Sequence, residues 1–297
     1  MAKKEKTDIN QFKITDGTKF SLVDYPTEVK KKGLDKEEGE LLIQKDIEEL
    51  AALQDVLYAE NRHAVLIIIQ AMDAAGKDGT IKHIMSGVNP AGVKVSSFKS
   101  PSSIELDHDY FWRHYPALPG KGEIGIFNRS HYENVLVTKV HPEFILNEKH
   151  SQINSEKDVN KAFWQDRYKQ ICRFEKNLAE NDTLILKFFL HVSKDVQKKR
   201  FLDRIDDPKK NWKFSAADLK ECAFWDDYQL AYEDAIKNTA KKSAPWFVIP
   251  ADEKWYTRYL IGNIICSELK KLDLAYPVIS DTEKAALLKA KEVLLSE

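Results

Sequence analysis

The alternation of hydrophobic and polar positions along the chain predicts an α/β fold. Over residues 36–61, apolar side chains recur every three or four positions, which is the spacing of an amphipathic helix. Residues 64–69 then form a short, fully apolar and mostly β-branched run, typical of a parallel strand buried on both faces. Further strands are predicted over residues 92–98, 123–127, 183–190 and 246–250, and further helices over residues 103–115, 162–178 and 254–272.

Strands that alternate with helices indicate a mostly parallel sheet with helices on both faces. We therefore expect a three-layer α/β sandwich around a five-stranded parallel sheet. Residues 1–40 are predicted to be an N-terminal extension, since the first 35 or so are polar and lack periodicity, and residues 41–297 to be one domain. Two further helix starts are indicated: Ser193 as the N-cap of a basic helix, and Ser215 with Asp218 as a capping box.

Composition narrows the classes of protein. Charged residues make up 31% of the chain but nearly cancel to a net charge of −1, unlike the basic excess of most nucleic-acid-binding domains. The three cysteines are far apart and in no metal-ligand spacing, which favours reduced thiols in a cytoplasmic protein. The longest apolar run is far too short to cross a membrane, and no apolar stretch follows the charged N-terminus as it would in a signal peptide.

The turn after the first strand, residues 70–80, resembles a nucleotide-binding P-loop. Gly76 and Lys77 stand where a strand gives way to a helix, so backbone N–H groups and a lysine can meet phosphate. Ala71 replaces the first glycine of the usual motif, and Asp78 replaces the Ser or Thr that holds Mg²⁺. Asp73 is then the obvious carboxylate for the metal. An ordinary strand–helix turn remains the alternative on these residues alone.

The third predicted strand ends in Asn128, Arg129 and Ser130. Ligands of doubly wound sheets bind at the carboxyl ends of strands, so these side chains are expected beside the P-loop. Arg129 is suited to gripping phosphate oxygens, because its guanidinium is a planar donor of several hydrogen bonds. The alternative is a structural arginine paired with a carboxylate.

A basic segment follows the fourth strand. Residues 198–213 hold seven bases and three acids, and Arg200 and Arg204 lie one helical turn apart on a shared face. Further bases flank the P-loop at Lys82, Lys94, Lys99 and Arg113. Together they predict a cationic track longer than one nucleotide needs, although a solvated surface is the simpler alternative.

Three strings of this sequence resemble the signatures of the family-2 polyphosphate kinases: residues 71–79 (AMDAAGKDG), 124–133 (IGIFNRSHYE) and 199–213, with its KRF..R and WK. The resemblance covers about residues 41–272, with the motifs in the expected order. It implies a P-loop kinase-like fold with a helical lid at about residues 198–220, and Mg²⁺-dependent phosphoryl transfer between inorganic polyphosphate and AMP, ADP or ATP. The family is commonly oligomeric, which implies a homodimer or homotetramer.

The resemblance also implies roles for individual residues. Four would be catalytic: Asp73, which also binds the metal, Lys77, Asn128 and Arg129. Those implied to bind phosphate or polyphosphate are Ala74, Ala75, Gly76, Asp78, Gly79, Thr80, Lys82, Lys99, Arg113, Arg200, Arg204 and Lys213, the last three on the lid. Those implied to bind the nucleotide are Ser130, Glu133 and Asn134. No general base is assigned, because a nucleotide phosphate oxygen is already an adequate nucleophile.

One departure inside the family bears on the acceptor. Members that mainly interconvert nucleoside di- and triphosphates often carry an aspartate where this chain has Asn128. The sequence here is similar to the class III subgroup, which implies phosphorylation of both AMP and ADP. A neutral amide neither repels an incoming anion nor requires a metal beside it.

Two other functions stay open on the sequence. An ATP-dependent nucleoside monophosphate kinase would explain the P-loop but not the long cationic track. A protein that binds polyanions or single-stranded nucleic acid would use aromatic side chains such as Phe98, Trp112 and Tyr115 for stacking. Their helical spacing favours a place in the core instead.

Overall fold

The computed structural model describes residues 8–28, 34–213 and 216–296, and its centre is a six-stranded sheet. The strand order is β1-β6-β5-β2-β4-β3, and every neighbouring pair is parallel except β1 with β6. The strands are β1 Lys13–Ile14, β2 Ala64–Ala71, β3 Val93–Ser97, β4 Ile124–Asn128, β5 Thr183–His191 and β6 Trp246–Pro250. The five predicted parallel strands are confirmed, and β1 adds an antiparallel strand at one edge.

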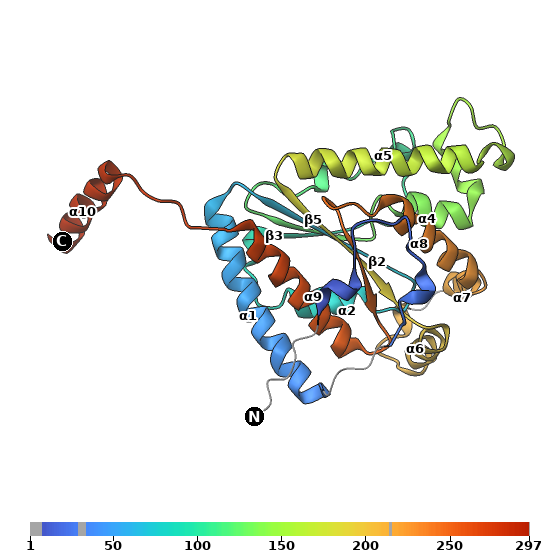
Figure 1. Cartoon of the computed structure of the whole chain (residues 1–297), viewed down its shortest axis with the longest axis horizontal. Coiled ribbons are helices and arrows are strands. Elements are labelled where there is room, and N and C mark those ends of the chain that lie inside the picture. Colours follow the sequence, from blue (N-terminus) through green and yellow to red (C-terminus); the bar gives the residue numbers. More distant parts are fainter. Residues whose placement is uncertain (1–7, 29–33, 214–215, 297) are drawn as a thin grey trace.

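Helices cover both faces of the sheet, which confirms the three-layer sandwich. Figure 1 shows α5, α4 and α8 on one side and α1, α2 and α9 on the other. The helices are α1 Lys36–Glu60, α2 Lys77–Ile84, α3 Ser103–Leu106, α4 Glu133–Val140, α5 Lys161–Glu180, α6 Lys194–Asp206, α7 Ala216–Cys222, α8 Trp225–Thr239, α9 Lys254–Leu269 and α10 Asp281–Ser296.

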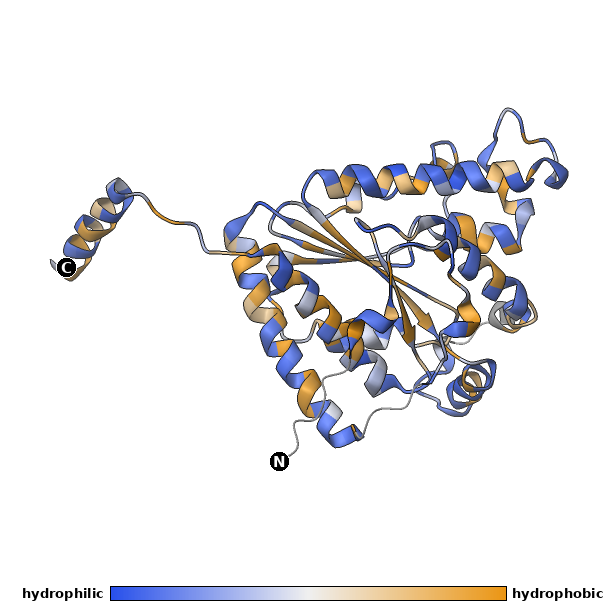
Figure 2. Ribbon diagram, in the orientation of Figure 1, coloured by the Kyte–Doolittle hydropathy of each residue, from blue (hydrophilic) through white to orange (hydrophobic). Residues whose placement is uncertain are grey.

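The core lies where the sequence is most apolar. Every residue of β2 is buried, and the strands form the continuous orange centre of Figure 2. Ser193 caps α6 by accepting the N–H of Val196, as predicted, and Asp35 caps α1 in the same way by accepting the N–H of Glu38. Ser215 lies outside the described residues. None of the described helices is long and apolar enough to cross a membrane.

The predicted helix over residues 103–115 is wrong beyond its first turn. A capping box between Ser102 and Glu105 starts α3, but the helix ends at Leu106 and gives way to turns. The carboxylate of Asp109 accepts the N–H of Phe111 at 2.9 Å, a local bond that competes with helical hydrogen bonding.

The two ends of the described chain differ in how they pack. Phe12, Ile14, Phe20 and Leu22 are buried, so residues 8–28 contribute side chains to the core. This segment also reaches the strand ends, where the hydroxyl of Thr27 donates to the carboxylate of Asp252 at 2.7 Å. At the other end of the chain, α10 is exposed throughout and stands apart from the sheet (Figure 1). Residues 281–296 therefore lie outside the domain core.

Candidate functional site

A cavity of about 1060 Å³ opens at the carboxyl ends of the parallel strands. Its lining combines the turn after β2, the end of β4, the helix after β5 and the helix after β6. This is the edge at which doubly wound folds bind ligands. The lining residues are Asp73–Thr80, Ser97, Lys99, Ser100, Asn128, Arg129, Arg200, Asp203, Arg204, Lys210, Trp212, Lys254 and Arg258.

The turn between β2 and α2 has the backbone of a phosphate-binding loop. Ala74 and Gly76 both adopt left-handed conformations, with φ of 60° and 104°. A Cβ on Gly76 would meet nothing within 4 Å, so glycine is favoured there by conformation and not by space. The Lys77 ammonium donates to the carbonyl oxygen of Ala71 at 2.6 Å, which folds the side chain back over the loop. Burial lowers the pKa of Lys77, while the Asp73 carboxylate opposes the shift.

Helix α6 holds this turn from behind. Gln197 donates to the carbonyl of Asp73 at 2.9 Å, and Arg200 donates to those of Ala74 at 3.3 Å and Ala75 at 2.9 Å. Because peptide units are planar and trans, the N–H groups that follow the carbonyls of residues 73 and 75 point away from α6. Those of Ala74 and Gly76 are thus turned to the side that can cradle an anion.

Arg200, which the family resemblance places on the lid, makes its contacts with backbone groups. It is buried, and its guanidinium also donates to the carbonyls of residues 251 and 252, at 2.8 and 2.9 Å. It joins the P-loop to the end of β6. Arg204, one turn further along, is half-buried and lies beside the Phe201 ring. Both arginines line the larger cavity, Arg200 from a buried position and Arg204 from a half-buried one.

The end of β4 meets the P-loop through two polar contacts. Arg129, with a left-handed φ of 63°, donates to the carboxylate of Asp73 at 3.2 Å. The side-chain amide of Asn128 donates to the carboxylate of Asp78 at 2.8 Å. Arg129 thus pairs with a carboxylate, as the structural alternative proposed, but its side chain remains 40% exposed at the cavity wall.

A second, smaller cavity of about 290 Å³ adjoins the first, and Lys99, Ser100 and Arg129 line both. The three residues predicted to bind the nucleotide also line it: Ser130, Glu133 and Asn134. Its aromatic walls are formed by Phe98, Tyr110 and Phe144. Burial raises the pKa of Glu133 above its ordinary value, although Arg129 and Lys77 oppose the shift. Two compartments of different chemistry therefore meet at Arg129.

Comparison with known proteins agrees with this arrangement. Residues 33–276 match the family model "Polyphosphate kinase 2 (PPK2)". The chain belongs to the polyphosphate kinase 2 family. This confirms the resemblance inferred from the three sequence motifs.

Two relatives and one solved structure illustrate the similarity. The chain is 47% identical over 285 residues to an ADP-polyphosphate phosphotransferase of Rhodopseudomonas palustris, covering 96% of this chain and 98% of that protein. It is 48% identical over 228 residues to an AMP/ADP-polyphosphate phosphotransferase of Meiothermus ruber, covering 77% and 80%. The crystal structure of polyphosphate kinase 2 from Arthrobacter aurescens TC1 superposes with a TM-score of 0.82 at 37% identity, covering 93% of this chain and 95% of that one.

Three of the residues predicted to bind phosphate do not line the larger cavity in the described part of the structure. Lys82 is exposed on α2 and lines neither cavity. Arg113 lines the smaller cavity, where it donates to the carbonyl of Lys99 at 2.8 Å and pairs with Glu105. The side chain of Lys213 lies outside the described part of the structure.

Sequence reasoning missed Gln197, which donates to the P-loop backbone, and two residues that line the larger cavity, Lys254 and Arg258. The last two follow the predicted strand over residues 246–250, so the rule that ligands bind at carboxyl strand ends could have found them. Neither falls within a dense basic segment, so the charge pattern alone does not single them out.

A buried polar network supports the turn that carries Arg129. The Lys187 ammonium donates to the carboxylate of Glu175 at 2.6 Å and to the hydroxyl of Tyr132 at 2.9 Å. That hydroxyl donates to Glu175 at 2.7 Å. Burial would raise the pKa of Glu175, but Lys187 and His131 hold it below its ordinary value. The hydrogen bonds of Lys187 and Glu175 fix Tyr132 three positions after Arg129.

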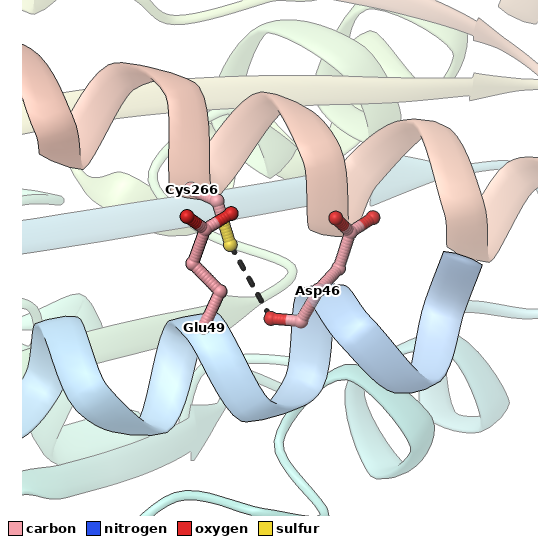
Figure 3. Close-up of side chains that lie close together, drawn as sticks. All are labelled: Asp46, Glu49 and Cys266. Atoms are coloured by element: carbon pink, nitrogen blue, oxygen red, sulfur yellow. Dashed lines mark hydrogen bonds between the residues drawn. The ribbon is translucent and has the colours of Figure 1, made fainter. Parts of the chain in front are cut away.

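Away from the cavities, Asp46, Glu49 and Cys266 bring potential metal-ligand atoms within 4.8 Å of one another between α1 and α9 (Figure 3). The thiol of Cys266 donates to the backbone carbonyl of Asp46 at 3.3 Å, and Lys270 pairs with Glu49. Burial raises the pKa of Cys266 to about 12, so the thiol stays protonated near neutral pH. The group is best explained as a contact between packed helices, and it is distinct from the predicted metal ligand Asp73.

Proposed function

We propose that this polyphosphate kinase 2 uses inorganic polyphosphate to phosphorylate AMP and ADP in a Mg²⁺-dependent reaction. The observation that carries the proposal is the pair of cavities that meet at Arg129 beside Lys77. The larger would take the polyphosphate donor and the smaller the nucleotide acceptor. The two relatives named above carry the corresponding activities in their names.

The charge of the larger cavity supports a polyanionic donor. Among the described residues, eight cationic side chains line it against three carboxylates, in a chain whose net charge is −1. The cations are Lys77, Lys99, Arg129, Arg200, Arg204, Lys210, Lys254 and Arg258. A water-filled cleft lined by one sign of charge concentrates ligands of the opposite sign.

The smaller cavity supports a nucleoside phosphate acceptor. Aromatic and apolar walls from Phe98, Tyr110 and Phe144 suit a base, while Lys99 and Arg129 stand at the junction with the donor cavity. Asn128 lies on the donor side of this junction and is neutral. Acceptor phosphates of different charge are therefore tolerated, which supports the use of both AMP and ADP.

The P-loop carboxylates fit a hard cation. Asp73 and Asp78 both line the larger cavity, and each carboxylate accepts one hydrogen bond, from Arg129 and Asn128 respectively. Mg²⁺ takes oxygen ligands and commonly binds through one or two carboxylates together with phosphates and water. Asp73, assisted by Asp78, would hold the ion, which when bound neutralises phosphate charge.

The chain's own groups supply positioning and charge. Phosphoryl transfer has a loose transition state, so catalysis rests on aligning donor with acceptor and stabilising the equatorial oxygens. N–H groups of the P-loop and the Lys77 ammonium meet the donor end, and Arg129 reaches the same point from β4. The Asp73–Arg129 pair fixes these groups relative to one another before substrate binds.

The test is formation of ADP and ATP from AMP with polyphosphate, compared with ATP as the donor. We expect product only with polyphosphate, and loss of turnover in excess EDTA with recovery on adding Mg²⁺. A transfer from ATP alone would instead indicate a nucleoside monophosphate kinase. Binding of polyphosphate without turnover would indicate a polyanion-binding protein. Homo-oligomerisation stays a prediction, to be measured by light scattering.

A further inference from the structure

The start of α9 extends the donor cavity beyond the P-loop. Lys254 and Arg258 lie four residues apart, hence on one face of the helix, and both line the cavity together with Lys210. Helix α9 packs beside α2, which begins at Lys77 (Figure 1). The guanidinium of Arg258 would be 3.6 Å from a Cβ placed on Gly79, so it reaches the first turn of α2.

These cations are held close together without a matching set of acids. Neither Lys254 nor Arg258 forms an ion pair with any carboxylate in the described part of the chain. Burial lowers the pKa of Lys254, and the neighbouring charges of Arg200, Arg258 and Lys210 lower it further, while the Asp203 carboxylate opposes the shift. Mutual repulsion of this kind costs free energy in the empty protein, and a bound anion relieves it.

The helix itself adds to the positive potential. Lys254 is the first residue of a helix of 16 residues, whose first-turn N–H groups carry partial positive charge, and Arg258 follows one turn later. The two cations and the helix terminus therefore both favour binding of an anion in this part of the cavity.

We propose that Lys254 and Arg258 bind distal phosphates of the polyphosphate donor, beyond the phosphoryl group held at Lys77. This inference rests on the proposed function. It also explains a preference for polyphosphate over ATP as the donor. A nucleoside triphosphate bound in this cavity would place its uncharged base, and not a phosphate, beside these two cations. Among the described residues that line this cavity, Trp212 is the single aromatic, and its side chain is largely exposed.

The experiment compares wild type with Lys254→Gln, Arg258→Gln and the double variant, using AMP as acceptor and long-chain polyphosphate as donor. We expect KM for polyphosphate to rise about tenfold or more in the double variant, with kcat at saturation and KM for AMP changed by less than about twofold. The slope of log KM against log salt should flatten by roughly 0.7–0.9 for each phosphate that the variant no longer binds. The ratio of kcat/KM with polyphosphate as donor to kcat/KM with ATP as donor should fall.

Two controls isolate the cause. Arg173→Gln removes the same charge from an exposed position on α5, across the sheet, and should leave the polyphosphate KM unchanged. The swap Lys254→Arg with Arg258→Lys keeps both charges and should retain most of the affinity. If the neutral variants do not fold, the swapped variant still tests the proposal. The salt dependence of its KM for polyphosphate has to match that of wild type.

Failure of this inference is separable from failure of the proposed function. A wild-type protein that makes no product from polyphosphate overturns the function. A wild type that uses polyphosphate, with a double variant whose KM and salt slope are unchanged, overturns only the role of Lys254 and Arg258. Equal losses in the charge-keeping swap would show that packing matters instead of charge.

Discussion

Two arginines one helical turn apart on α6 are predicted to behave differently. Arg200 donates four hydrogen bonds to backbone carbonyls of the P-loop and of the segment after β6. Arg204 is half-buried at the cavity and lies near the Phe201 ring. Arg200→Ala should therefore disturb the site and the fold, whereas Arg204→Ala, its matched control, should weaken only the binding of polyphosphate.

The magnitude follows from the bonds. A hydrogen bond from a charged donor contributes about 1.5–3 kcal/mol net, but water from the adjacent cavity can replace part of what Arg200→Ala removes. We expect a loss of about 2–4 kcal/mol, well short of the sum over four bonds. For a domain of this size that corresponds to a fall in Tm of roughly 5–15 °C. Arg204→Ala should cost at most about 1 kcal/mol.

The assay combines thermal melting with initial rates at saturating AMP. Arg200→Ala should lower kcat about 10²-fold, because the carbonyls that orient the P-loop N–H groups lose their donor. Arg204→Ala should raise KM for polyphosphate with little change in Tm. An Arg200→Ala variant with wild-type Tm and kcat would refute the reasoning, as would equal falls in Tm for both variants.

Three further predictions address the reacting groups. Lys77→Ala and Arg129→Ala should each lower kcat about 10²-fold or more, measured by initial rates with circular dichroism as the control for folding. Asn128→Asp replaces the 2.8 Å bond to Asp78 with two facing carboxylates, so the ratio of AMP to ADP turnover should change several-fold in initial-rate assays; an unchanged ratio would remove Asn128 from acceptor choice. Because the pKa of Glu133 is raised in the fold, its contribution to stability is present below the ordinary glutamate pKa and is lost as pH rises through the folded value. Melting curves across that window should show Glu133→Gln gaining stability relative to wild type as pH rises, and a constant difference would contradict the shift.

Much of the fold could be predicted because the pattern of hydrophobic residues is strong where the sheet is buried. The run that forms β2 is apolar almost throughout, and it is the central strand between β4 and β5. β1 could not be predicted, since a strand of two residues carries no periodicity and is fixed by pairing with the distant β6. The helical pattern over residues 103–115 predicts too long a helix, because it does not register the local bond to Asp109 that competes with helical hydrogen bonding.

Site residues could be predicted where a side chain suited to binding phosphate directly follows a predicted strand. Lys77, Arg129 and Asn128 follow directly from strand ends and lie at the cavity. The family resemblance places Arg200 on a lid, and a basic residue in a basic segment gives no sign of being buried. Its true partners are backbone carbonyls from two other segments, and sequence patterns do not report which carbonyls a fold leaves unpaired.

Phosphoryl groups are proposed to pass from polyphosphate to a nucleotide at the meeting point of the two cavities. Polyphosphate labelled with ³²P and incubated with unlabelled AMP and Mg²⁺ tests this transfer most directly. The label should appear in the β-phosphate of ADP and then in the β- and γ-phosphates of ATP, at a rate that matches consumption of AMP and falls in Lys77→Ala and Arg129→Ala. Label released only as free phosphate, with the nucleotide unlabelled, would contradict the account.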